Sequence, residues 1–380
     1  MAGQVSSRFF LRALLISAIL LAFPAVAETP AENAMKKAAA YLWAQQAEDG
    51  SWPSKTYGVL KTGQALTPFV LNALMQVPEE IAPAPKEKVE KALAYVRKNV
   101  NADGVLGLSD PLIAEYPNYA TALAVVVLAR TKPAKDSDDA KLLDKMVAYL
   151  KTQQLNGDGD KGWKPSDPAF GAWGYGGVPV KKPDAGHADL SVTRYVLEAL
   201  RAWKQAEHDG AFKDARRFLA RLQNLKIPKH DHPPIGDGGF FFSTVLPDAN
   251  KAGKDGDSFK SYGTATADGV LALRACKADS ISLEAAERWL LKHHQSGGVP
   301  GVPADGEKRW DQSIRFYYTG ASAPALRGTE SDKDWRKPLR EFLLKSQRED
   351  GSFVNDNLVV KEDDPLIATP LALIALIHSR

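Results

Sequence analysis

The chain has 380 residues, with 49 Lys and Arg against 46 Asp and Glu, a formal net charge of +3, and a single cysteine, Cys276. One cysteine excludes an intramolecular disulfide framework and a multi-cysteine zinc site. Because charges of both signs are intermixed and no basic stripe carries interleaved aromatic residues, we expect no nucleic-acid partner.

The first predicted element is an export signal at residues 1–27. Two arginines precede an apolar run over about residues 14–23, and Ala25-Val26-Ala27 follows it. This order is typical of a cleaved secretory signal peptide, and the run is shorter than the ~20 residues of a membrane-spanning helix. We therefore expect an exported protein, periplasmic or extracellular, with no stable membrane anchor after cleavage and a single domain over residues 28–380.

A sequence pattern then recurs along the chain. An aromatic and an aliphatic residue are followed four positions later by Gln, then by glycine and an aromatic residue, as in "YLWAQQAEDGSW" from Tyr41 to Trp52. Further copies contain Gln154, Gln223 and Gln347, and two weaker ones cover residues 95–100 and 289–294. In the copy with Gln154, we assign the glycine and the aromatic residue to Gly162-Trp163. A fixed repeat of this kind indicates an array of identical structural units.

Each unit has a second landmark, a Thr, then six residues with small or aliphatic residues among them, then a Leu. The six threonines are Thr67, Thr121, Thr193, Thr266, Thr319 and Thr369. The first segment of each unit is amphipathic and the second is apolar all round, so the second is the buried one. One helical hairpin cannot bury its inner helix, whereas six can close on themselves. The sequence therefore predicts an all-α, six-hairpin α/α toroid whose inner helices begin near these threonines.

The first repeat, "KAAAYLWAQQAEDGSW", resembles the QW repeat of squalene cyclases, and the mature chain resembles the terpenoid cyclase and protein prenyltransferase superfamily. In squalene cyclases the slot before the Thr of the third repeat carries Asp-x-Asp-Asp, whose central Asp donates the proton. Here the slot reads Asp189-Leu190-Ser191-Val192. A serine hydroxyl is too weak an acid for that reaction. The "DSDD" at residues 136–139 is interpreted instead as the cap of the next outer helix.

The resemblance to prenyltransferases points to three zinc-ligand slots, and none holds a ligand. Tyr318 stands in the His slot, and Tyr262 and Thr264 stand in the Asp and Cys slots. His230 and His232 could chelate a metal, but no third ligand is identifiable. We therefore predict neither squalene cyclisation nor zinc-dependent prenyl transfer, and expect no metal and no cofactor.

The remaining candidates lie where the inner helices begin, next to two long inserts after Gln154 and Gln223. In the inserts, the aromatic residues Trp163, Trp173, Tyr175 and Phe240 to Phe242 either line a ligand cavity or pack the loops. The catalytic candidates are Asp189, His187 and Asp311, and the ligand-binding candidates are Trp173, Tyr175, Tyr262, Arg315 and Tyr318. Asp189 either caps its helix or pairs with His187 for acid–base chemistry.

Asp311 and Arg315 have the i, i+4 spacing of an ion pair on a helix. We expect His187, Asp189, Tyr262, Asp311, Arg315 and Tyr318 to approach one shared pocket at this rim.

Three functions remain open at this point. The first is a toroid that binds a small-molecule ligand, isoprenoid-like or otherwise apolar, in its central cavity. The second is a carbohydrate-active toroid that uses rim carboxylates such as Asp189 and Asp311. The third is a non-catalytic interaction scaffold.

Overall fold

The computed structural model describes residues 1, 28–109, 113–177, 180–203, 209–226, 233–329 and 334–380. The predicted export signal and the pair His230 and His232 lie outside these residues, so both stay predictions.

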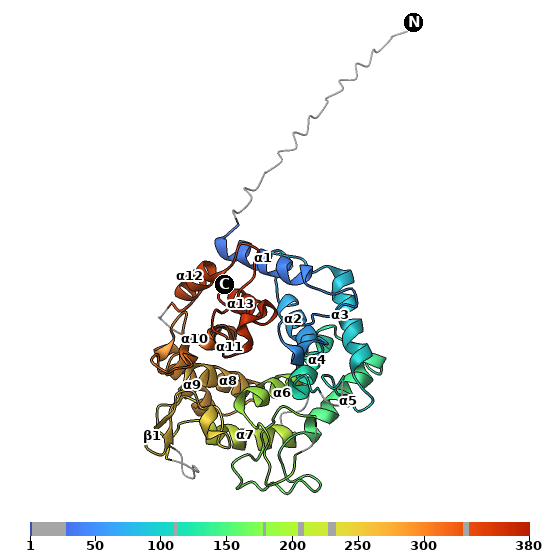
Figure 1. Ribbon diagram of the computed structural model, residues 1–380. Coiled ribbons are helices and arrows are strands. Elements are labelled where there is room, and N and C mark those ends of the chain that lie inside the picture. Colours follow the sequence, from blue (N-terminus) through green and yellow to red (C-terminus); the bar gives the residue numbers. More distant parts are fainter. Residues whose placement is uncertain (2–27, 110–112, 178–179, 204–208, 227–232, 330–333) are drawn as a thin grey trace.

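The described chain forms two concentric layers of helices (Figure 1). The outer layer consists of α1 (Pro30–Ala44), α3 (Lys86–Asn99), α5 (Asp138–Thr152), α7 (Gly210–Leu222), α9 (Ser280–His293) and α12 (Arg336–Ser346). The inner layer consists of α2 (Leu66–Leu74), α4 (Pro117–Arg130), α6 (Leu190–Ala202), α8 (Gly263–Ala275), α11 (Arg315–Leu326) and α13 (Pro365–His378). Each inner helix contacts the next, and α13 contacts both α2 and α1, so the ring closes. The predicted toroid is confirmed.

Short elements complete the described chain. The helix α10 (Trp310–Ser313) and the 3-10 turns η1 (Gly58–Leu60), η2 (Pro247–Ala249) and η3 (Lys361–Asp363) lie in loops. The strands β1 (Lys254–Asp255) and β2 (Ser258–Phe259) pair antiparallel in the second insert. The inserts lead into the N-termini of α6 and α8, which places them at one mouth of the ring, called the insert-side rim below.

The glutamine of the repeat joins neighbouring outer helices. Gln46 Nε2 donates to the carbonyl of Gly50 in its own loop, at 3.1 Å, and to that of Lys88 in the first turn of α3, at 2.9 Å. Gln154 and Gln223 repeat this pair of bonds toward α7 and α9. Gln347 bonds to Ala34 in α1, which closes the ring. The side-chain amides of these glutamines thus connect neighbouring helices of the outer layer.

The threonine of the repeat holds the loop against the inner helix. Its Oγ1 accepts a hydrogen bond from the backbone N–H of a residue in the loop before the helix, as between Thr67 and Trp52 at 3.1 Å. Thr121, Thr193, Thr266 and Thr369 do the same. Thr319 differs, because its hydroxyl donates to the carbonyl of Phe316.

The assignment of Gly162-Trp163 to the third repeat is wrong. Gln154 bonds to the carbonyl of Gly171, and the N–H of Trp173 bonds to Thr193 Oγ1 at 3.1 Å. Gly171 has φ +91°, and a Cβ there would lie 2.0 Å from the carbonyl oxygen of Asp214. Only glycine fits so close to the neighbouring helix. The interpretation of "DSDD" as a cap is confirmed, since Ser137 is the N-cap of α5 and accepts from the N–H of Ala140.

Candidate functional site

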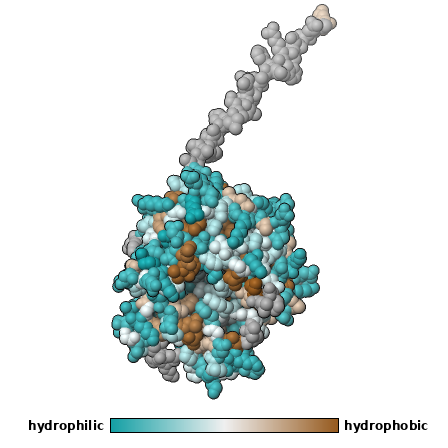
Figure 2. Space-filling model, in the orientation of Figure 1, coloured by the Kyte–Doolittle hydropathy of each residue, from teal (hydrophilic) through white to brown (hydrophobic). Residues whose placement is uncertain are grey.

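A cavity of about 500 Å³ lies in the middle of the ring, toward the C-terminal ends of the inner helices. Figure 2 shows the centre of the molecule hollowed, with hydrophobic side chains around the hollow. All six inner helices contribute to its apolar wall, which consists of Phe69, Leu123, Val126, Tyr195, Leu271, Pro324, Leu371 and Ile374. Its volume is within the range of small-molecule sites. The cavity lies toward the opposite mouth from the rim that the sequence pointed to.

The charged residues that line the cavity are mostly cationic. They are Arg130, Arg194, Arg201 and Arg274, with one carboxylate, Glu198, and the imidazole of His378. Burial lowers the pKa of His378 to about 4, and the neighbouring cations Arg327 and Arg130 add to this effect. The imidazole is therefore neutral at physiological pH.

A chain of polar side chains crosses the ring beside the cavity. Tyr119 Oη of α4 donates to Ser191 Oγ of α6 at 2.7 Å, and Ser191 is hydrogen-bonded to Tyr317 of α11. Tyr317 Oη lies 3.0 Å from Asp268 Oδ2 of α8. Arg194 Nη1 lies 3.6 Å from Asp268 Oδ1. We call these five residues the polar bridge.

Asp268 is the carboxyl of the polar bridge, and its pKa is strongly shifted. It is 2% exposed. Burial raises its pKa to about 7, against the opposing effects of Arg194 and the hydrogen bond from Tyr317. Arg194 also bonds to Glu198, at 3.0 Å, so its guanidinium stands between the two carboxylates. That position leaves no room between them for the sugar ring of a glycosidase substrate.

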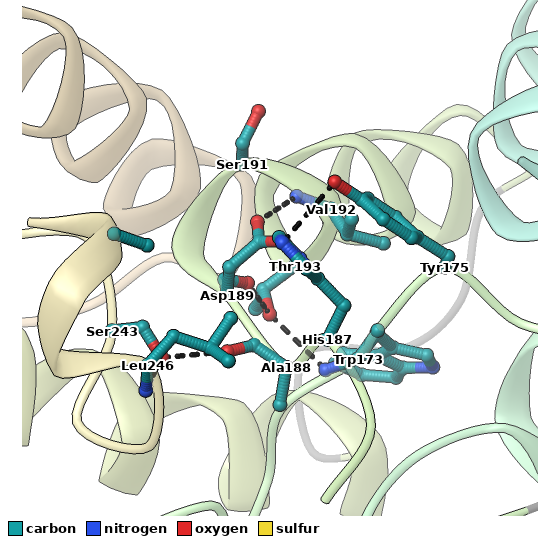
Figure 3. Close-up of polar contacts among 12 residues, drawn as sticks. Trp173, Tyr175, His187, Ala188, Asp189, Ser191, Val192, Thr193, Ser243 and Leu246 are labelled. Atoms are coloured by element: carbon teal, nitrogen blue, oxygen red, sulfur yellow. Dashed lines mark hydrogen bonds and ion pairs between the residues drawn. The ribbon is translucent and has the colours of Figure 1, made fainter.

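His187 and Asp189 are brought together at the insert-side rim, as Figure 3 shows. The imidazole Nδ1 and Asp189 Oδ2 are 2.9 Å apart, and Asp189 also accepts from the N–H of Val192, as the N-cap of α6. Asp189 therefore caps α6 and also contacts His187, and an acid–base role of the pair stays a prediction. Burial raises the pKa of Asp189, and the bond from His187 opposes this. Because a carboxylate only accepts, Nδ1 carries the proton and Nε2 is left as a base.

Tyr175 contacts the imidazole of His187. Its ring stacks on the imidazole at 4.1 Å between centroids, and its hydroxyl lies 3.3 Å from His187 Nε2. Ser191 points away from the imidazole in Figure 3, so Ser191 and His187 do not form a nucleophilic pair. What the arrangement offers is an oriented general base with an exposed aromatic ring beside it.

Other partly exposed rings surround the pair. Tyr116 meets Tyr175 edge to face, with centroids 5.1 Å apart. Lys251 Nζ lies 4.8 Å from the ring centroid of Phe242 and 5.0 Å from that of Trp310. Burial lowers the pKa of Lys251. The insert-side rim thus presents aromatic faces together with a largely desolvated ammonium group.

The remaining sequence candidates are buried or paired with other residues. Trp173 is fully buried, and its indole N–H donates to the carbonyl of Leu150 at 2.6 Å. It is therefore the aromatic residue of the third repeat and has a structural role. Tyr262 is fully buried too. Tyr318 is fully buried and faces His294, whose Nδ1 lies 3.1 Å from its hydroxyl. Of the six residues expected at one pocket, only His187 and Asp189 are hydrogen-bonded to each other.

The predicted ion pair between Asp311 and Arg315 is wrong. Asp311 pairs with Arg309 instead, at 3.0 Å. The reason is that the helix breaks at Ile314, which has φ −117° and ψ 29° between α10 and α11. The i, i+4 spacing requires one continuous helix. The guanidinium of Arg315 lies over the ring of Phe316, 5.3 Å from its centroid.

The insert aromatic residues divide between the two interpretations. Trp163, Trp173, Phe240 and Phe241 are buried and pack the loops, while Tyr175 and Phe242 remain accessible. Sequence reasoning missed Asp268, because it compared only the positions just before each threonine. It missed Tyr317, two residues before Thr319, because it selected the neighbouring Tyr318 as the residue in the His slot. The signal for Asp268 was a lone carboxylate two residues after Thr266, in an otherwise apolar helix.

Within the described ranges, no group of three His, Cys, Asp or Glu side chains is placed to hold a metal ion. None of the helices described is long and apolar enough to cross a membrane.

The fold and the cavity define the class of the protein as an α/α toroid with a central pocket. No family model and no curated protein matches the sequence. Solved structures do match in fold. A variant of the type II terpene cyclase MstE from Scytonema, in complex with geranylgeranyl dihydroxybenzoate, superposes with a TM-score of 0.57 at 16% identity, over 92% of this chain and 97% of that chain.

Two further toroids are similar. A protein from Actinoplanes gives a TM-score of 0.57 at 15% identity, over 92% of this chain and 99% of that chain. An inactive variant of an α-1,6-mannanase of Salegentibacter, in complex with α-1,6-mannotriose, gives 0.52 at 13% identity, over 92% and 98%. The fold is therefore that of both a terpene cyclase and a mannanase, and at this identity it carries no function by itself.

Proposed function

We propose that this protein is an exported toroid of the terpenoid cyclase and prenyltransferase type that binds an elongated apolar ligand, isoprenoid-like in shape, in its central cavity. The observation that carries the proposal is the cavity of about 500 Å³, to whose apolar lining all six inner helices contribute. A wall of this kind favours hydrocarbon over water. Ser191 in the cyclase acid slot and Tyr262, Thr264 and Tyr318 in the zinc slots support a ligand-binding role without either family chemistry.

A cavity-filling substitution tests the proposal. Val126 is partly exposed and lines the cavity, so Val126→Trp places an indole in the ligand's space. We expect it to weaken binding of farnesol, measured by isothermal titration, roughly tenfold or more relative to the unmodified protein. Ile281→Trp is the matched control, because Ile281 is 72% exposed on the outer helix α9. Farnesol binding equal in the two variants would contradict the proposal.

A carbohydrate-active function has support at the insert-side rim, where accessible Tyr175 and the pair of His187 and Asp189 resemble a sugar-stacking surface beside a base. Its weakness is the carboxylates. Asp189 is 1% exposed, and Asp311 is engaged by Arg309. Neither is left free to serve as the second of the two carboxyl groups that glycoside hydrolysis uses. A pure scaffold is also less favoured, because the toroid does not fill its centre with its own side chains.

A further inference from the structure

The ligand's polar end can be inferred from the charges at the mouth of the cavity. The polar bridge neutralises one of the four lining arginines, since Arg194 faces both Glu198 and Asp268. Arg274 is paired with Glu287 at 2.6 Å. Arg130 and Arg201 remain, near the C-terminal ends of the adjacent helices α4 and α6.

These two guanidinium groups have no carboxylate partner within 4.0 Å among the described residues. Arg130 stands at the exposed edge of the cavity. Partial burial of its guanidinium lowers its pKa, and Glu198 opposes this effect. Arg201 Nε donates to the carbonyl of Ala275 at 2.8 Å, and its guanidinium lies over the ring of Phe212. Its Nη2 is buried with no hydrogen-bond partner in the part of the chain described. Buried donors are rarely left without an acceptor.

Burial is the main cause of the low pKa of His378, and the nearby cations Arg327 and Arg130 lower it further. Arg327 Nη1 lies 3.4 Å from its Nδ1. The mouth therefore holds an apolar cavity and two arginines without an ion-pair partner among the described residues, one of which, Arg201, has a buried donor that lacks an acceptor.

We propose that Arg130 and Arg201 bind the anionic head group of a single-chain amphiphile, a carboxylate or a phosphate monoester, whose apolar chain occupies the cavity. This inference rests on the proposed function and names the polar half of its ligand. Arginine binds both head groups through paired N–H···O bonds, and such charge-assisted bonds are stronger than neutral ones. A dianionic phosphate monoester would use both guanidinium groups.

A structural alternative explains the arginines without a ligand. Both lie in the last turn of their helices, where a cation stabilises the helix dipole. That effect changes the free energy of unfolding but gives no preference between ligand head groups. The two explanations therefore differ in a measurable property.

The experiment uses four amphiphiles of equal chain length, namely dodecanoate, dodecyl phosphate, dodecanol and dodecyltrimethylammonium, each titrated below its micelle concentration into the full chain at neutral pH. We expect at least one anion to bind roughly tenfold more tightly than dodecanol and the cation to bind more weakly than dodecanol. The anion that binds more tightly identifies the head group that the site prefers, a carboxylate or a phosphate monoester. The preference should shrink with added salt, because the contact is ionic.

Variants assign the preference to the two residues. Arg130→Gln changes an exposed side chain that has no ion-pair partner among the residues described, so it is not expected to disturb folding. The double variant with Arg130→Gln and Arg201→Gln removes both charges. Each should bring anion binding toward that of dodecanol measured with the same variant. Arg288→Gln, on an exposed arginine of α9, is the control and should have no effect.

Equal binding of the anions and dodecanol, or an anion preference that survives both substitutions, would overturn the inference while the proposed function stands. Failure of all four amphiphiles to bind would overturn both.

Discussion

At the scale of single residues, the most informative side chain is Asp268, which sequence reasoning missed. Its carboxyl is buried between Tyr317 and Arg194, and its pKa is about 7. In the unfolded chain a carboxyl of this kind has a pKa of about 3.9. The folded protein therefore binds a proton that the unfolded protein has released, over the whole interval between these values.

The first prediction follows from that difference. The contribution of Asp268 to stability is complete below about pH 4 and is lost as the pH rises through about 7, by on the order of 4 kcal/mol. Glu362, also buried and with a pKa raised to about 7, adds a similar loss. We expect Asp268→Asn to flatten the decline in the free energy of unfolding between these pH values, measured by urea titration at a series of pH values.

The variant Glu362→Gln should flatten the curve comparably, and the two substitutions together should flatten it most. Only the slope with pH is at issue, since Asp268→Asn also takes a charged partner from Arg194. An unchanged slope in Asp268→Asn would mean that this carboxyl is ionised in the folded protein throughout the range.

At the scale of elements, the glutamine of each repeat connects neighbouring outer helices through hydrogen bonds. The amide of Gln46 ties its loop to α3, and the adjacent Gln45 has no side-chain hydrogen bond within the described chain. Two neutral hydrogen bonds contribute roughly 1 kcal/mol each. We predict that Gln46→Leu lowers the free energy of unfolding by about 2 kcal/mol, and that Gln45→Leu changes it by less than about 0.5 kcal/mol. Equal effects of the two substitutions in denaturant titrations would show that the tie has no energetic importance.

The elements also show what a sequence can and cannot predict here. The six helix pairs follow from periodicity and from the threonine register, because both reflect local burial. The choice between Gly162 and Gly171 does not, since it depends on how closely the loop approaches Asp214 in another helix. Likewise, Tyr317 and Tyr318 differ by one step of about 100° around α11, and only the packing of neighbouring helices decides which of them faces the centre. The break at Ile314 that separates Asp311 from Arg315 has no signal in the local pattern.

At the scale of the whole molecule, a terpene cyclase and a mannanase have the same ring of helices, so function depends on the residues that line the centre. In this chain the centre has two faces. The insert-side rim carries His187, Asp189 and exposed rings, and the other mouth opens into an apolar cavity edged by arginines. The polar bridge lies between them. We propose that the ligand lies in the cavity and not among the inserts.

The most direct test of that placement is photo-crosslinking with a long-chain carboxylate that carries a diazirine at its methyl end, followed by mass spectrometry of the peptides. The account predicts label on inner-helix peptides containing Leu123, Leu271 or Leu371, and loss of that label in Val126→Trp but not in Ile281→Trp. Label concentrated on insert peptides around Tyr175 or Phe242, unaffected by Val126→Trp, would contradict it.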